Sequence, residues 1–275
     1  GIVDPEMKLK HANLWLDGKV DVMCATNSFG MGIDKANVRF VIHLSSPASY
    51  EAYVQESGRA GRDGHDSHCV ILHRFEDRKF QLLNITKLTS ANARSKWLSS
   101  LNEFTSYMIV KVNCHQQTIS EYFGSLVNGK CGNGGNCLKI VIPLETDCTL
   151  HAKQLVSCLQ HMVSIKDKVS VDDLALTYIG SKSMIVKTNK LDQVPKHGKG
   201  KGSFKSTSHL TGFINYLIII DIFVENLRDE NDRVKSTFLT LGEIKELLNG
   251  DMNVLHKIIN TEKHLFFCSA VIPNI

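Results

Sequence analysis

Short apolar runs alternate with helix-spaced apolar positions along the first third of the chain. The runs predict three buried strands, over residues 20–26, 38–43 and 68–72. Helix-spaced positions predict helices over 4–17 and 49–57. Strands that alternate with helices in this way favour an α/β fold with a parallel sheet, whose ligands bind at the carboxyl ends of the strands.

The pattern becomes helical after residue 75 and ends in a hairpin. One helical region is predicted first, and three further helices then precede two strands that flank an acidic turn. The predicted ranges are 76–124, 147–162, 170–180 and 207–220 for helices, and 223–228 and 234–241 for strands. Three helices followed by a hairpin is the order of a winged helix. Residues 251–275 show no motif and suggest a truncated or misjoined end.

Composition indicates a globular protein of one large or two ordinary domains, because the 275 residues are 43% hydrophobic and 22% charged. A net charge of +4 is too mild to indicate a nucleic-acid partner by itself. Eight cysteines spread along the chain favour metal binding or burial in a reducing compartment over disulfides. No apolar run approaches the length of a membrane span. The chain does not begin with Met, and we expect it to be a piece of something longer.

The candidate chemistry is concentrated in residues 55–64, Gln-Glu-Ser-Gly-Arg-Ala-Gly-Arg-Asp-Gly. Arg59 and Arg62 each follow a glycine, which lets the backbone approach a ligand closely. The planar guanidinium of arginine matches phosphate oxygens, and if the segment begins a helix both arginines share one face. The segment therefore predicts a polyphosphate grip. The alternative is a glycine-rich surface turn with two solvated arginines.

Three segments together, 25–35, 38–43 and 55–64, resemble motifs V and VI of the RecQ family of DNA helicases. That resemblance implies the second RecA-like lobe of an ATP-driven motor that moves 3′ to 5′ on single-stranded DNA. ATP with Mg²⁺ would bind between this lobe and a first lobe that carries a Gly-Lys-Ser/Thr phosphate loop. No such loop occurs in the 275 residues, so we expect this chain alone to be inactive as an ATPase.

The same resemblance assigns roles to individual residues. Arg62 is the implied arginine finger, and Arg59 and Gln55 support the γ-phosphate. The other implied contacts are ATP for Asp34, Gly32 and Gly58, and the tracking DNA strand for Thr26 and Asn27. Two alternatives stay open, a helix-capping or loop carboxylate for Asp34 and a strand-end hydroxyl for Thr26.

A helical platform with a zinc site follows the second lobe in RecQ proteins. Its closing signature resembles residues 114–124, which would supply the first ligand, Cys114. Cys131 and Cys137 continue the ligand set, but Gly134 stands where a further cysteine belongs. Three thiolates leave one position of a tetrahedral zinc site open, for water or for a neighbour such as His115 or Cys148. The alternative is three free, partly buried thiols.

Residues 145–250 resemble the winged helix of RecQ proteins, most of all in the Bloom-syndrome helicase branch. In that fold, loop lysines and amides meet duplex phosphates, which implies DNA contacts for Lys199, Lys201, Ser203 and Lys205. The alternative is a flexible solvated loop. The hairpin tip, 229–232, is acidic and lacks an aromatic residue, so we expect a weak unwinding wedge.

The resulting prediction is an α/β lobe, a helical zinc platform and an α+β winged helix, with boundaries at 1–76, 77–142, 145–250 and an unassigned 251–275. The implied function is a nuclear ATP-dependent DNA helicase in repair and recombination, whose partners are single-stranded and forked or duplex DNA and the missing first lobe, with no membrane. The alternatives are a DNA-binding module without catalysis and a structural adaptor.

Overall fold

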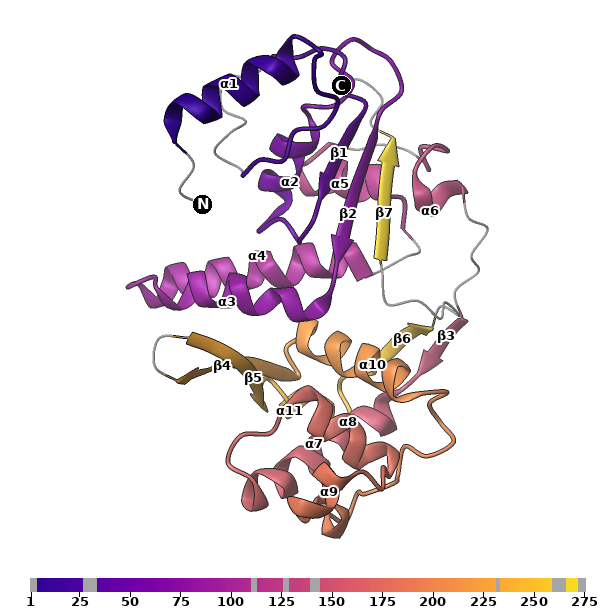
Figure 1. Cartoon of the computed structure of the whole chain (residues 1–275). Coiled ribbons are helices and arrows are strands. Elements are labelled where there is room, and N and C mark those ends of the chain that lie inside the picture. The colour runs from indigo at the N-terminus through magenta and orange to yellow at the C-terminus, as the bar shows by residue number, and fades with distance from the viewer. Residues whose placement is uncertain are drawn as a thin grey trace.

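The structure is a computed structural model that describes residues 4–26, 34–109, 113–125, 129–138, 144–230, 233–258 and 266–271. Three parts follow one another along the chain (Figure 1). A small sheet with its helices comes first, two helices over residues 78–86 and 91–109 lie between, and a helical part with a hairpin comes last. Within the described residues no helix combines the length and the apolar character that crossing a membrane requires.

The first helix begins where the sequence predicts. α1 (Pro5–Leu16) has Asp4 as its N-cap, whose side chain accepts a hydrogen bond from the backbone N–H of Glu6. The strand predicted over 20–26 is wrong, because these residues are irregular and Val22 is 73% exposed. A strand is stable only beside a partner strand, and in the described part of the chain this segment has none.

The sheet has the strand order β1-β2-β7. β1 (Phe40–His43) and β2 (His68–His73) are parallel, which confirms the predicted α/β arrangement, and α2 (Tyr50–Ser57) connects them. β7 (Phe266–Val271) adds to the other edge of β2 in antiparallel register. This strand comes from the region in which the sequence shows no motif.

An aromatic cluster joins the sheet to the helices that follow it. After η2 (Phe75–Asp77) come α3 (Arg78–Thr86), α4 (Ala91–Ile109), α5 (His115–Tyr122) and α6 (Gly135–Leu138), so the predicted helical region is confirmed. Tyr50 and Tyr53 of α2 pack against Phe104 and Tyr107 of α4, and all four are almost fully buried. These edge-to-face and tilted ring pairs fix α4 beneath the sheet.

The last part has the predicted order of helices and hairpin. It contains β3 (Leu144–Asp147), α7 (Thr149–Ile165), α8 (Val171–Ile179), α9 (Met184–Thr188), η3 (Leu191–Gln193), α10 (Thr207–Ile219), β4 (Phe223–Glu230), β5 (Arg233–Leu241), α11 (Lys245–Asn249) and β6 (Leu255–Ile258). β4 and β5 form the hairpin, and β3 pairs with β6. We call this the winged-helix part.

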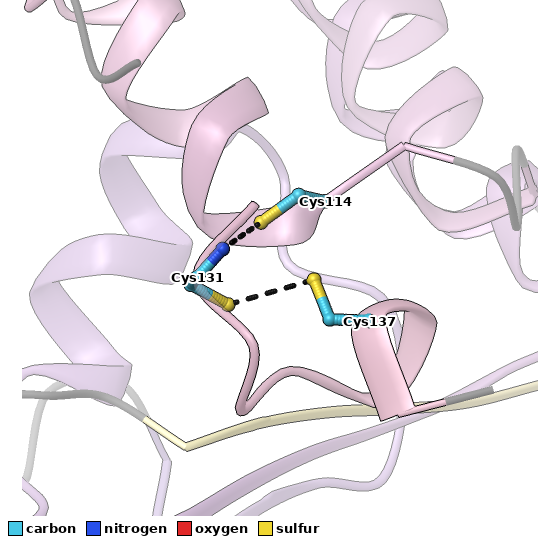
Figure 2. A group of neighbouring side chains, drawn as sticks. All are labelled: Cys114, Cys131 and Cys137. Carbon is cyan, nitrogen blue, oxygen red and sulfur yellow. Dashed lines mark hydrogen bonds between the residues drawn. The ribbon is translucent and has the colours of Figure 1, made fainter. Parts of the chain in front are cut away.

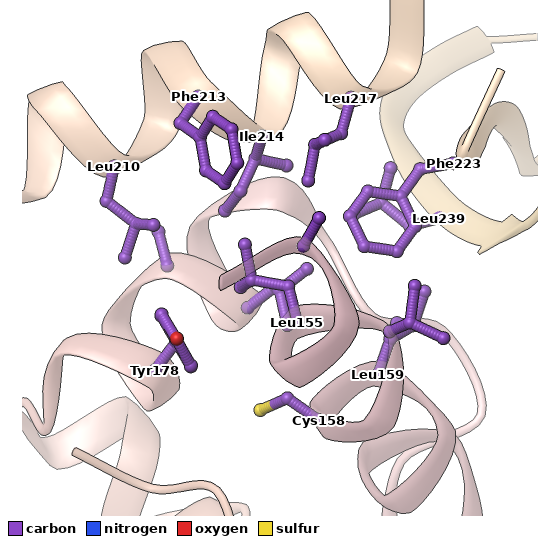
Figure 3. Packing of buried hydrophobic residues seen from close by; sticks show 14 of the residues in the cluster. Leu155, Cys158, Leu159, Tyr178, Leu210, Phe213, Ile214, Leu217, Phe223 and Leu239 are labelled. Atoms are coloured by element: carbon purple, nitrogen blue, oxygen red, sulfur yellow. The ribbon is translucent and has the colours of Figure 1, made fainter. Parts of the chain in front are cut away.

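Its core is built by side chains from α7, α8 and α10 that meet those of the hairpin root (Figure 3). Leu155, Phe213 and Phe223 are fully buried at its centre. α8 begins with the predicted capping box, in which Ser170 and Asp173 bond each other's backbone N–H groups. Local capping and long-range burial therefore agree on the position of this helix.

α3 and α4 lie between the sheet and the winged-helix part (Figure 1). α4 contacts α10, and α3 contacts both strands of the hairpin. Phe75, just before α3, is buried in the core cluster of the winged-helix part. The hairpin root is therefore attached directly to the helices that follow the sheet.

Candidate nucleotide, DNA and metal sites

The arginine segment 55–64 follows a helix rather than beginning one. α2 ends at Ser57, and Gly58 caps it, because its N–H donates to the carbonyl oxygen of Val54 at 2.9 Å. The chain turns through Gly61, whose φ is +66°, and reaches β2 at its amino end. The expected shared helix face is therefore wrong, and the loop does not lie at the carboxyl ends of the strands, where a parallel sheet usually binds its ligands. α2 runs antiparallel to the two strands that it connects. The loop after α2 therefore begins near the amino ends of β1 and β2.

Arg62 lies beside Asp34 in this loop region. Its Nη1 is 2.8 Å from Oδ1 of Asp34, and its Nε is 3.5 Å from the carbonyl oxygen of Gly58. The side chains of Arg62 and Asp34 are 38% and 84% exposed, so the pair lies at the surface. The structure thus brings together two residues that the resemblance assigns to the nucleotide. Around them, Gln55 is exposed and Arg59 is half-buried.

The glycine-lysine loop before α10 is anchored to the winged-helix core. The N–H of Gly198 donates to the carbonyl of Thr177 at 3.0 Å, and the N–H of Gly200 donates to that of Tyr178 at 2.8 Å. A Cβ at position 200 would lie 2.6 Å from the Tyr178 ring, so only glycine fits there. Phe204 closes the loop by packing into the core. The alternative of a flexible, solvated loop therefore does not describe this segment.

The four predicted phosphate contacts all lie on the outer side of this anchored loop. They are exposed in the structure: Lys199, Lys201, Ser203 and Lys205. Thr26 is also exposed, whereas Asn27 and Gly32 lie outside the described residues. The side chains of the acidic hairpin tip, 229–232, are outside the described part of the chain, so the prediction of a weak wedge stays a prediction. Lysines on a fixed backbone suit contact with a DNA backbone, which positions a protein without reading sequence.

Three cysteines that are far apart in sequence form one cluster (Figure 2). The sulfur atoms of Cys114, Cys131 and Cys137 lie within 4.8 Å of one another. The Sγ atoms of Cys131 and Cys137 are 3.7 Å apart. Zinc–sulfur bonds of about 2.3 Å at tetrahedral angles imply sulfur separations of about 3.7 Å. The cluster therefore fits three positions of a zinc site.

The backbone around the cluster prepares one thiol for ionisation. Burial raises the pKa of Cys114, but N–H groups of Cys131 and Gln117 donate to its sulfur and the pKa falls to about 7. Gly134 lies against the cluster, since a Cβ built there would be 3.3 Å from the sulfur of Cys131. A cysteine at position 134 would thus begin its side chain beside the other ligands.

Neither neighbour considered for the fourth ligand belongs to the cluster. Among the described residues, the metal-ligating group consists of the three cysteines alone. Cys148 is instead buried in the winged-helix core, before α7. His115 is buried against Tyr107, with the ring centroids 4.8 Å apart. Water or an added ligand is therefore the fourth partner that this geometry allows.

A buried arginine network at the root of the hairpin has no signal in the sequence. Arg78 is 1% exposed and donates to Oδ1 of Asn102 at 2.7 Å and to Oγ1 of Thr105 at 2.8 Å. Its Nε is 3.4 Å from the carboxylate of Glu225 on β4. Nδ2 of Asn102 in turn donates to Asp221 at 3.1 Å. Burial lowers the pKa of Arg78, and Glu225 and Asp221 oppose that effect.

Two regions of the chain match domain families found in helicases, and whole proteins of one helicase family match most of its length. Residues 4–64 match the helicase conserved C-terminal domain, and residues 143–264 match the RQC domain. The ATP-dependent DNA helicase RecQ of Bacillus subtilis is 31% identical over 257 residues, which cover 94% of this chain and 41% of that protein. The chain belongs to the RecQ family of helicases.

Other RecQ-family relatives match over nearly the same range. The ATP-dependent helicase SGS1 of Saccharomyces cerevisiae is 31% identical over 260 residues, which cover 92% of this chain and 18% of that protein. The RecQ-like DNA helicase BLM of Xenopus laevis is 29% identical over 253 residues, or 85% of this chain and 18% of that protein. The chain thus spans well under half the length of these relatives.

Proposed function

We propose that this RecQ-family chain supplies the arginine side of an ATP site and a duplex-binding winged helix to an ATP-dependent DNA helicase. The whole enzyme would move 3′ to 5′ on single-stranded DNA and unwind duplexes in repair and recombination, in the nucleus. The observation that carries the proposal is the Arg62–Asp34 pair, which unites two separate helicase motifs at one surface point.

The proposed nucleotide contacts form one half of a site. Arg62 would stabilise the charge that develops on the transferred phosphoryl group, an effect worth about 10³–10⁵ in rate for an arginine finger. Arg59 and Gln55 would support the γ-phosphate, and Asp34, Gly32 and Gly58 would contact ATP. Before the nucleotide binds, Asp34 would pair with Arg62. The first RecA-like lobe would provide the phosphate loop and the Mg²⁺ ligands. We therefore expect no ATP turnover from residues 1–275 alone.

The proposed DNA contacts come from two parts of the chain. Thr26 and Asn27 would touch the single strand along which the motor moves. Lysines 199, 201 and 205 with Ser203 would hold the duplex phosphates, because their loop is fixed to the core and their side chains are exposed. We propose domain boundaries at 1–76, 77–142 and 145–250, with β7 of the 251–275 segment returning to the first sheet.

Zinc is the proposed structural metal, held by Cys114, Cys131 and Cys137. When bound, zinc would cross-link α5 to the segment before α6, with the protein supplying three of four ligands. Thiolate ligands require deprotonation, and the lowered pKa of Cys114 favours it.

The DNA-binding part of the proposal is tested with this chain and a forked duplex. Replacing Lys199 and Lys201 by alanine should weaken binding and reduce the slope of log affinity against log salt by about 2, since each phosphate contact contributes about 0.9. The matched control replaces Lys8 and Lys10 of α1, which are also exposed and carry the same charge. Unchanged affinity and slope in the first variant would contradict the assigned loop.

A DNA-binding module without catalysis is the second candidate. Gly134, in place of a fourth ligand, favours it, because a weakened structural site suits a relative that no longer needs a rigid platform. Strand separation by the complete polypeptide in the presence of ATP would exclude this candidate. Salt-sensitive DNA binding without ATP turnover would support it.

A further inference from the structure

Arg39, the residue before β1, reaches across to the loop that carries Arg62. Its Nη2 lies 2.6 and 2.7 Å from the two carboxylate oxygens of Asp63, and its Nη1 donates to the carbonyl of Asp66 at 3.1 Å. Its other donors meet the carbonyls of Asn37 and Ala36, at 3.3 and 3.4 Å. One guanidinium thus donates hydrogen bonds both to the segment after Asp34 and to the segment after Arg62.

Backbone bonds hold both ends of the same loop. The N–H of Gly61 donates to the carbonyl of Val38 at 3.0 Å, and the N–H of His68 donates to that of Arg39 at 2.9 Å. These bonds extend the β1–β2 pairing to both sides of the arginine turn. Residues 62–66 between them are exposed and have no core packing of their own. The Arg39 side chain therefore ties the middle of the loop, at Asp63 and Asp66, to the start of β1.

The glycines of the loop make such a tie necessary. Gly61 and Gly64 have φ values of +66° and +84°, a region that other residues rarely adopt. Glycine permits this turn but does not restrict it to one conformation, because it has no side chain to pack. The side chains of Arg39 and Asp63 are 33% and 23% exposed, so their ion pair, in which one nitrogen contacts both carboxylate oxygens, is partly shielded from water. Short charge-assisted bonds of this kind are stronger than bonds between neutral groups.

We propose that Arg39 is a positioning residue for ATP hydrolysis, which holds Arg62 in register with the Asp34 segment through its bonds to Asp63 and the neighbouring carbonyls. The inference rests on the function proposed above and goes beyond it in naming the residue that aims the finger. Arginine is required, because lysine offers one point charge and cannot meet the carboxylate and three carbonyls together. Misplacement of a catalytic group by about 1 Å can cost about 100-fold in rate.

The test uses the complete helicase polypeptide, including its phosphate-loop lobe, and compares Arg39→Lys and Asp63→Asn with wild type. We expect the kcat of DNA-stimulated ATP hydrolysis to fall by about 10- to 100-fold, while KM for ATP and DNA affinity change by less than about threefold. The double variant should lose no more than the worse single variant, because both changes remove one interaction. The matched control is Arg74→Lys, since Arg74 also pairs with an aspartate, Asp77, at 3.0 Å but outside this loop.

The outcomes distinguish a failure of the positioning role of Arg39 from a failure of the proposed helicase function. A kcat within twofold of wild type in Arg39→Lys, or a rise in KM alone, would overturn the positioning role while leaving the helicase function intact. Absence of ATP turnover in the wild-type helicase would overturn both. Should Arg39→Lys fail to fold, Asp63→Asn carries the same test, because it alters one side chain on an exposed loop.

Discussion

Replacing Arg78 by methionine tests the link between the winged-helix part and the helices α3 and α4. Methionine keeps the length of the side-chain stem and removes the charge and its donors. The change leaves Glu225, whose side chain is 5% exposed, without its cationic partner. Breaking a buried ion pair in this way costs about 3–5 kcal/mol, and the bonds lost to Asn102 and Thr105 act in the same direction.

That cost is large beside the stability of a typical domain, about 5–15 kcal/mol. Urea unfolding of the 275-residue chain, followed by circular dichroism, should therefore show a clearly lower midpoint for Arg78→Met. Arg74→Met is the control, because the side chain of Arg74 is 69% exposed and its ion pair is worth at most about 1 kcal/mol.

The double variant Arg78→Met with Glu225→Gln should recover part of the loss, since it removes the unpaired buried charge. A loss below about 1 kcal/mol in Arg78→Met would contradict a stabilising role for the buried network, because surface pairs already cost that much. So would a double variant that is less stable than the single one, since Glu225 would then stabilise the fold without Arg78.

Three further predictions concern packing, metal binding and pH. Gly200→Ala should destabilise the chain by about 1–3 kcal/mol, because the new Cβ meets the buried Tyr178 ring, whereas Gly212→Ala, with open space around it, should not lower the unfolding midpoint. Gly134→Cys should bind zinc more tightly than wild type under native mass spectrometry with a competing chelator, and equal retention would argue against a three-thiolate site. Burial lowers the pKa of His73 to about 4, so the unfolded state takes up the proton first, and this residue alone should lower the free energy of unfolding by about 2 kcal/mol between pH 7 and pH 5. His115, whose pKa burial also lowers to about 4, should add a similar amount. His73→Gln should therefore remove only the His73 share, and an unchanged slope would contradict that share.

Local signals in the sequence were sufficient for most helices and for the hairpin. Asp4 and Ser170 cap the helices that they were predicted to cap, and the spacing of apolar residues placed α2 and α10 within a residue or two. These features depend on neighbours within one or two turns, which the sequence displays directly. The family resemblance added that Cys114, Cys131 and Cys137 should come together, because motifs carry long-range information that periodicity lacks.

Features that depend on distant partners could not be predicted in this way. Residues 20–26 have the apolar character of a strand but no strand beside them, whereas β7 pairs with β2 from nearly 200 positions away. Arg78 looks like an ordinary helix-start arginine in the sequence. Its burial arises because Glu225 arrives from β4, 147 positions later. Pairing and burial of this kind are set by the tertiary fold, and so they override local propensity.

Arg62 is proposed to complete an ATP site and not to bind DNA. The most direct measurement compares ATP turnover and DNA affinity of Arg62→Ala in the complete helicase polypeptide, with Arg94→Ala on the exposed face of α4 as the control. We predict that ATP turnover falls by about 10³-fold or more while DNA affinity stays within about twofold of wild type. Reduced DNA affinity with surviving ATP turnover would contradict the assignment of Arg62 as the arginine finger, because Arg62 would then contact DNA and not ATP.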